Sequence, residues 1–293
     1  MVVTAKDIRN AARLLEPHVM RTPMVQSPLL SQQLQCELHL KLECLQYTSS
    51  FKARGAYVAM QNLTEEQRSL GVIAMSAGNH AQAVAYHAGK MNIPAVIVMP
   101  SQTPFAKVAR TQNYGAEVVL EGRNLNECEV RVQALIEYRR LTLIHPYDDA
   151  NVIMGQGTVG LEMLIDQPDL DVLVVPIGGG GLMSGIATIA REMRPDIRII
   201  GVQTESYPSM QAARLNEDML CGGETLAEGI AVKKPGRLTL PIIVDSVDDI
   251  LLVNEKQLEW AVSALVEQQR VIAEGAGAAG IAAIYAYPEL FKN

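Results

Sequence analysis

Short runs of β-branched residues alternate along this chain with stretches of helical periodicity, and this alternation limits the folds that are possible. We predict buried strands at 37–42, 72–75, 95–99, 117–120, 172–176 and 198–203. We predict helices between them at 52–62, 79–91, 104–113, 124–140, 152–165 and 181–193. Strands that alternate with helices indicate an α/β protein with mainly parallel sheets.

The predicted strands form two groups, one at 72–120 and one at 172–203. At 293 residues the chain is long enough to bury a large core. We therefore expect two α/β lobes with a cleft between them. Ligands of open α/β sheets bind beyond the carboxyl ends of the strands, so the loops that directly follow strands are the first places to look for a site.

Composition excludes several classes of partner. The net charge is −7 and aromatic residues make up 4% of the chain, so we expect no nucleic acid and no membrane among its partners. The cysteines form no C-x-x-C pair, which argues against a zinc site and a disulfide framework. The N-terminus is amphipathic rather than a signal peptide, and no apolar run is long enough to span a membrane, so we expect a cytoplasmic protein.

Four consecutive glycines, Gly178, Gly179, Gly180 and Gly181, join a predicted strand to a predicted helix. Such a loop lets the backbone approach a ligand and turn its N–H groups inward, and the following helix adds its positive end. The pattern predicts a phosphate site, although a flexible turn would have the same composition. Neither the dinucleotide fingerprint G-x-G-x-x-G nor the G-K-[ST] of the P-loop fits, which favours a small phosphorylated cofactor.

The stretch VIAMSAGNHAQ has the same order of strand, loop and helix. Backbone N–H groups of this loop, with Ser76 as an N-cap type residue, would hold a carboxylate. Asn79 offers both a donor and an acceptor. The alternatives are that Ser76 and Asn79 only cap the helix, and that His80 has a structural role.

Lys52 lies among small and apolar residues in SSFKARGAY, at the predicted start of a helix. A lysine held near a phosphate site suggests a Schiff base with pyridoxal phosphate. Burial would favour the neutral amine that this chemistry needs. Taken alone, the same lysine would more often be a snorkelling surface side chain.

Together these stretches resemble the fold-type II pyridoxal-phosphate enzymes, in particular the threonine/serine dehydratase and serine racemase group. Six motifs occur in the order typical of that group: SSFKARGA, SAGNHAQ, GQGTVGLE, PIGGGGLMSG, LAEGIAV and EGAG. The resemblance implies a tryptophan synthase β-like α/β fold of two open twisted domains, with the active site in the cleft between them. The large cofactor-binding domain would comprise 1–66 and 144–293, and the small substrate-closing domain 67–143.

The resemblance also assigns roles to individual residues. Lys52 would be the catalytic lysine, which binds the cofactor and carries the α-proton, with Phe51 packed beside the cofactor ring. Asn79 would bind the phenolic oxygen of the cofactor, while Glu274 and the Gly229 backbone would line the ring side of the site.

Two loops would bind the charged groups of cofactor and substrate. The cofactor phosphate would lie against the backbone of Gly178, Gly179, Gly180, Gly181 and Leu182. The substrate carboxylate would enter the loop formed by Ser76, Ala77, Gly78 and His80.

The implied reaction is the dehydration and deamination of L-threonine or L-serine to 2-oxobutanoate or pyruvate and ammonia. Serine racemases carry a second serine at the position of Ala77, and without that hydroxyl elimination is favoured over racemisation. A racemase, or a dehydratase of another β-hydroxy amino acid such as hydroxyaspartate, remains the alternative. A cysteine-synthase-type transferase is disfavoured, because that branch has a different lysine motif and phosphate loop.

Two departures from the group affect these expectations. Gln203 and Ser209 stand where racemase-like members have carboxylate ligands for a divalent metal, so we expect no metal there, although Glu205 is near. The chain also stops at YPELFKN, where the group continues with a strand and an SGGN-like turn. We therefore expect truncation or compensation by a partner, and a non-catalytic pyridoxal-phosphate-binding protein stays open as a different class of function. The group further suggests a homodimer or homotetramer.

Overall fold

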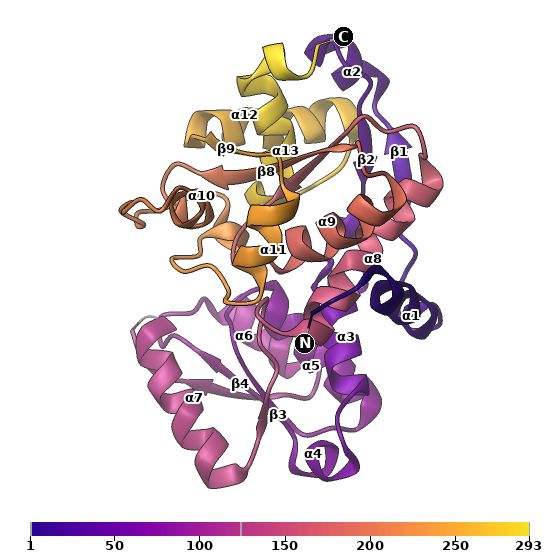
Figure 1. Cartoon of the computed structure of the whole chain (residues 1–293). Coiled ribbons are helices and arrows are strands. Elements are labelled where there is room, and N and C mark those ends of the chain that lie inside the picture. Colours follow the sequence, from indigo (N-terminus) through magenta and orange to yellow (C-terminus); the bar gives the residue numbers. More distant parts are fainter. Residues whose placement is uncertain (1, 124, 293) are drawn as a thin grey trace.

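The computed structural model describes residues 2–123 and 125–292 and places two parallel sheets in opposite halves of the molecule (Figure 1). The four-stranded sheet has the order β5-β4-β3-β6. Its strands are β3 (Val72–Met75), β4 (Ala95–Met99), β5 (Glu117–Leu120) and β6 (Thr142–Leu143). The helices in this half are α3 (Lys52–Gln61), α4 (Glu65–Leu70), α5 (Asn79–Met91), α6 (Phe105–Gln112) and α7 (Leu125–Arg139).

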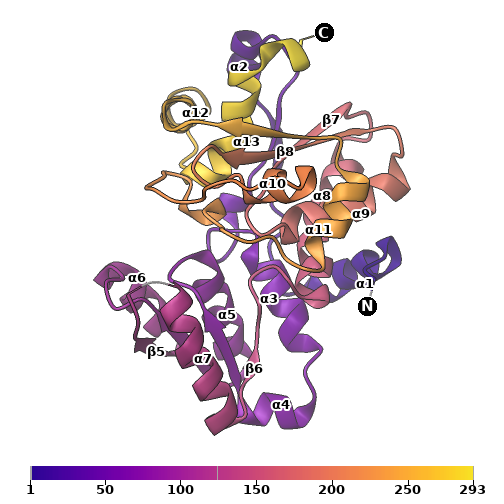
Figure 2. The same ribbon diagram turned by 60° about the vertical axis from the view of Figure 1, so that its left-hand side comes forward.

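The second half is built on a three-stranded parallel sheet with the order β7-β8-β9. Its strands are β7 (Val172–Pro176), β8 (Arg198–Thr204) and β9 (Asp249–Val253). Its helices are α8 (Ala150–Asp166), α9 (Gly181–Met193), α10 (Ser209–Leu215), α11 (Thr239–Ser246), α12 (Glu255–Ala264) and α13 (Gly275–Ala286). Shorter helical turns are η2 (Glu228–Ile230), η3 (Leu265–Gln269) and η4 (Pro288–Leu290). The turned view shows the same separation of the two sheets (Figure 2).

The N-terminal segment adds a small ribbon to the second half. It contains α1 (Ala5–Leu15), β1 (Met24–Gln26), α2 (Pro28–Leu34), β2 (His39–Lys41) and the turn η1 (Glu43–Leu45). Strand β2 pairs antiparallel with β1 and is half-buried, so the strand predicted at 37–42 is present, but the prediction that it is buried is wrong. All three residues of this short strand, His39, Leu40 and Lys41, are only partly covered.

The remaining predicted strands and the six predicted helices are present, with ends shifted by at most a few residues, and the predicted α/β class is confirmed. The strand predicted at 117–120 is present but not buried, because β5 is the outermost strand of its sheet. Strand β7 is also partly exposed, for the same reason. Among the residues described, no helix is long and apolar enough to cross a membrane.

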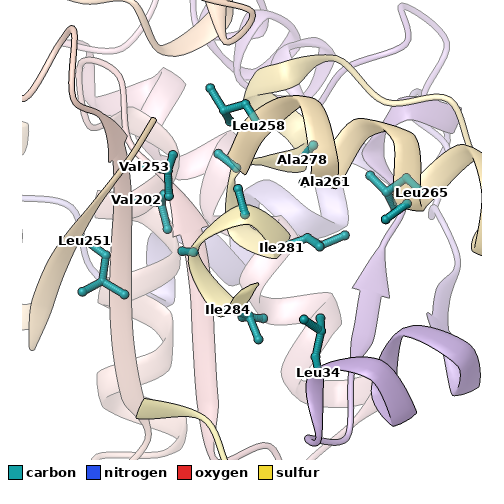
Figure 3. Packing of buried hydrophobic residues seen from close by; sticks show 14 of the residues in the cluster. Leu34, Val202, Leu251, Val253, Leu258, Ala261, Leu265, Ala278, Ile281 and Ile284 are labelled. Carbon is teal, nitrogen blue, oxygen red and sulfur yellow. The ribbon is translucent and has the colours of Figure 1, made fainter. Parts of the chain in front are cut away.

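The largest core packs α12 and α13 against the face of the three-stranded sheet (Figure 3). Val202 in β8 and Val253 in β9 face Leu258 and Ala278 from the two helices, and all four are fully buried. Alanines along α13 keep that helix narrow, so it can lie close to the sheet. This core fixes α13, whose first turn follows directly after Glu274.

Helix α8 packs against both α3 and α9 at very short distances, because glycines lie at the contacts. A Cβ atom added at Gly155 would lie 2.6 Å from the Cα of Gly55 in α3. A Cβ atom added at Gly185 in α9 would lie 2.5 Å from the backbone nitrogen of Gly157 in α8. Side chains do not fit at such separations, so the glycines of GQGTVGLE set the spacing of three helices.

The buried guanidinium of Arg54 joins α3 to η1 and α8 through ion pairs. The Arg54 side chain is 0% exposed. It donates to both carboxylate oxygens of Glu43 at 2.8–2.9 Å and to both of Glu162 at 2.6–2.9 Å. Lys41 Nζ lies 2.6 Å from Glu162 Oε2. Two bidentate ion pairs, one with Glu43 and one with Glu162, therefore fix both the position and the orientation of α3.

Replacing Gly155 by alanine should destabilise the fold, although alanine favours a helix interior over glycine by about 1 kcal/mol. The new Cβ would meet backbone atoms of Gly55 and Arg54 at 2.6–2.7 Å, so α3 and α8 would have to separate. We expect the free energy of unfolding, measured by urea denaturation, to fall by about 1–3 kcal/mol.

The matched control is Gly277→Ala in α13, where the nearest atom to an added Cβ is that of Ala273 at 3.6 Å. This variant should keep the stability of the parent or gain up to about 1 kcal/mol. An equal loss in both variants would show that close α3–α8 packing is not the cause.

Candidate active site

Every residue that the sequence analysis assigned to the site lines one cavity of about 1740 Å³. The loops after β3 and β7 contribute two sets of these residues, which agrees with the rule that ligands bind at the carboxyl ends of strands. The others lie at the start of α3, in η2 and just before α13. The cavity is larger than a small ligand requires, because it continues beside β7.

Lys52 is the first residue of α3, and its amine points into this cavity. Its Nζ donates to the Pro146 carbonyl at 2.7 Å, and the Phe51 ring centroid lies 5.4 Å away. The surrounding apolar atoms disfavour the charged form, so burial lowers the pKa of Lys52 from 10.5 to about 8. Much more of the amine is therefore neutral near pH 8 than in an exposed lysine.

The loop from Ser76 to Gly78 precedes α5, and the Ser76 side chain does not cap that helix. The N-cap residue of α5 is Gly78, without a side-chain cap bond, so the alternative in which Ser76 only caps this helix is wrong. Ser76 Oγ instead accepts a hydrogen bond from Gly78 N at 3.2 Å and shapes the loop. A Cβ at Gly78 would meet no atom within 4 Å, so the backbone here borders open space in the cavity.

Asn79 does not cap α5 either. Its Nδ2 donates to Glu274 Oε2 at 2.9 Å, which joins the loop after β3 to the start of α13 across the cavity. Gly229 lies beside this pair, because a Cβ there would come within 3.9 Å of Glu274 Oε2. The three residues predicted to surround a cofactor ring are therefore neighbours.

His80 follows this loop as the second residue of α5, and its side chain is buried. Its Nε2 lies 2.8 Å from the Ile144 carbonyl, which only accepts, so Nε2 carries the proton. Burial, with a smaller contribution from the charge of Lys52, lowers the pKa of His80 to about 3. The ring is therefore neutral over the physiological pH range.

The glycine loop provides backbone donors rather than side chains. The first helical hydrogen bond of α9 runs from Ser184 N to Gly180 O, so the amides just before Ser184 have no acceptor within the helix. Gly180 has a φ of 98°, a conformation that favours glycine. Thr239 Oγ1, at the start of α11, donates to Gly179 O at 2.6 Å and so fixes the position of the loop. This arrangement suits a phosphate at the positive end of α9.

The segment from His145 to Asp148 organises the site, and the sequence analysis missed it. Its Pro146 carbonyl binds Lys52, and its Tyr147 ring lies under Gly179, where a Cβ would come within 2.3 Å of the ring. His145 Nδ1 accepts from Asp148 N at 2.8 Å, and Asp148 Oδ1 accepts from Leu238 N at 2.7 Å. The available signal was IHPYDD, a cluster of polar and ring residues directly after a strand.

The cavity extends into a groove between two unpaired strand edges. Of the strands described, β7 pairs only with β8, and β2 pairs only with β1. Leu40 from β2, Val174 from β7 and Ile281 from α13 line this part of the cavity, together with Phe291.

Gln203 and Ser209, the positions considered for a metal, make only neutral contacts. The buried Gln203 side chain accepts from Met210 N and Gln211 N at 3.0 Å and donates to Ile177 O at 3.3 Å. Ser209 Oγ donates to Val232 O at 2.6 Å. Within the described residues, no three acidic, histidine or cysteine side chains group as metal ligands. Gln203 instead joins the start of α10 to the residue before the glycine loop.

Comparison with known proteins relates the chain to one enzyme family. A family profile described as pyridoxal-phosphate dependent enzyme matches residues 15–293. An L-threonine ammonia-lyase of Thermotoga maritima is 47% identical over 97% of this chain and 71% of its own. A catabolic L-threonine dehydratase of Staphylococcus aureus is 43% identical over 97% of this chain and 83% of its own.

Solved structures with the same fold include both deaminases and racemases. The processed form of threonine deaminase isoform 2 from Solanum lycopersicum superposes with a TM-score of 0.92 at 33% identity and covers 100% of this chain and 84% of its own. The serine racemase of maize superposes with a TM-score of 0.93 at 35% identity and covers 97% of this chain and 87% of its own.

Replacing Gln203 by leucine should lower the free energy of unfolding by about 1–3 kcal/mol for each buried polar group left without a partner. Urea denaturation measures this, with the exposed Gln32→Leu as the matched control, expected within about 0.5 kcal/mol of the parent. Because the contacts of Gln203 are neutral, EDTA should leave the melting temperature of the parent protein unchanged. A fall in melting temperature with EDTA that magnesium reverses would contradict this interpretation.

Proposed function

The chain belongs to the pyridoxal-phosphate-dependent enzymes of fold type II, and from this premise we propose that it dehydrates and deaminates L-threonine and L-serine. The observation that carries the proposal is that the Lys52 amine, with its lowered pKa, shares a cavity with the free backbone amides at the start of α9. The relatives named for threonine support the substrate class. The products would be 2-oxobutanoate or pyruvate, with ammonia.

Residues of this site fit pyridoxal phosphate. The free amides of the α9 N-terminus would bind the phosphate, Lys52 would bind the aldehyde carbon, and Asn79 would reach the phenolic oxygen. Phe51, Gly229 and Glu274 border the remaining space of the cavity. When bound, the cofactor accepts the electron pair that is left as the α-proton departs.

Lys52 is placed to take that proton. Its lowered pKa leaves a useful fraction of neutral amine, and the Pro146 carbonyl fixes the direction of Nζ. The loop of Ser76, Ala77 and Gly78, with the start of α5, would hold the substrate carboxylate through backbone N–H groups. Loss of the β-hydroxyl as water, followed by uptake of water and release of ammonia, gives the 2-oxo acid.

Closure of residues 67–143 over the substrate forms part of the proposal. Two polar contacts already join the two sides of the cavity: Asn79 with Glu274 at 2.9 Å, and Lys107 Nζ with Glu228 Oε2 at 2.7 Å. Both involve side chains that can rearrange as a substrate enters. Excluding water at this step would strengthen every charged contact in the site.

Lys52→Ala should abolish the visible absorption band of the lysine-bound cofactor and lower keto-acid formation from threonine on the order of 10²–10⁴-fold. The control is Lys6→Ala, which removes an exposed amine in α1 and should keep both signals. Threonine turnover by Lys52→Ala at the parent rate would refute the role of this amine. A visible band without any keto acid in the parent would favour a non-catalytic cofactor-binding protein.

Elimination without racemisation is the expected outcome with L-serine, because the methyl group of Ala77 supplies no acid or base to the loop. Chiral chromatography of the reaction mixture should detect pyruvate but no D-serine. Steady formation of D-serine by the pure protein would contradict this assignment and favour the racemase alternative.

A further inference from the structure

The second ring nitrogen of His80 is a buried acceptor for which the functions above give no role. His80 is 3% exposed, and its Nε2 is engaged by the Ile144 carbonyl at 2.8 Å. In this neutral tautomer Nδ1 carries a lone pair and can only accept. Within residues 2–123 and 125–292, no hydrogen-bond donor reaches Nδ1. A buried acceptor is unfavourable unless a donor reaches it at some stage.

Lys52, in contrast, lacks hydrogen-bond acceptors for some of its donors within the described residues. A lysine ammonium has three N–H donors, and the described part of the chain provides one acceptor, Pro146 O at 2.7 Å. Pro146 lies two residues after Ile144, so one short segment holds both Lys52 Nζ and His80 Nε2. Both side chains line the same cavity.

We propose that Nδ1 of His80 accepts a hydrogen bond from the Lys52 ammonium once that lysine has taken up the α-proton. The step is balanced without a further group: the Lys52 lone pair binds the proton, the new N–H donates to Nδ1, and the proton stays on Lys52. His80 is thus a positioning residue that acts through Lys52. This role rests on the proposed function, in which Lys52 is the proton acceptor.

The imidazole suits this role because it remains neutral beside the charge of Lys52. Burial is the largest influence that lowers the pKa of His80, the charges of Lys52 on α3 and His145 after β6 act in the same direction, and only the hydrogen bond to the Ile144 carbonyl opposes them. A carboxylate at this position would hold the proton more tightly and oppose its release. A neutral acceptor stabilises the ammonium moderately, so Lys52 can give the proton up again.

Two substitutions separate this role from a structural one. His80→Gln places an amide N–H near the position of Nε2, so it keeps the bond to Ile144 O and loses the acceptor at Nδ1. His80→Asn places its amide near Nδ1, so it keeps a possible acceptor for Lys52 and loses the bond to Ile144 O. If His80 only tied α5 to the end of β6, Asn would be the more damaging change.

The experiment measures the pKa of Lys52 in the full chain without cofactor, from the pH dependence of its acetylation by acetic anhydride, resolved by mass spectrometry of the Lys52 peptide. The parent should titrate near 8. His80→Gln should lower that pKa by about one unit, because it destabilises the ammonium about tenfold. His80→Asn should stay within a few tenths of a unit of the parent, and urea denaturation confirms that both variants are folded.

An unchanged Lys52 pKa in His80→Gln, or equal shifts in both variants, would overturn the proposal. The measurement is independent of turnover. A lowered pKa in His80→Gln together with no keto acid from the parent would refute the proposed function alone. Keto-acid formation with an unshifted pKa would refute the His80 role alone.

Discussion

The close packing of α8 between α3 and α9 is the constraint on which the site depends. Helix α3 begins with Lys52, and α9 begins at the glycine loop, so the distance between these helices sets the distance between the Lys52 amine and the backbone amides at the start of α9. Glycines at the contacts let the backbones touch, as the 2.5–2.6 Å separations of a hypothetical Cβ show. Larger side chains would hold helices at the usual 8–10 Å between axes and widen the site.

The charges around Arg54 complement this packing. Apolar and glycine contacts fix distance but allow rotation, whereas two bidentate ion pairs also fix orientation. The free-energy cost of removing the Arg54 charge from water is offset by its ion pairs with Glu43 and Glu162. Arg54 is two residues after Lys52 in the same helix, so the rotation of α3 about its axis determines where the amine points.

Much of the fold and the site could be predicted from the sequence, because both depend on local patterns. Buried β-branched runs, glycines after a strand and a lysine among apolar residues each have a direct physical meaning. The segment from His145 to Asp148 was missed, because its contacts join residues about 90 positions apart. The contact that Ser76 makes could not be predicted for a related reason: its hydroxyl accepts a hydrogen bond within its own loop, and this depends on backbone geometry.

The segment from Ile144 to Asp148 leaves the last strand of the four-stranded sheet and enters α8, so it belongs mechanically to both halves of the molecule. It also supplies the acceptors for Lys52 and His80. Any shift of the four-stranded sheet toward the other half would therefore move the loop from Ser76 to Gly78 and change the hydrogen bonds of the Lys52 amine together. In the proposed function, substrate binding by this loop and proton transfer by Lys52 are therefore coupled through a few consecutive peptide units.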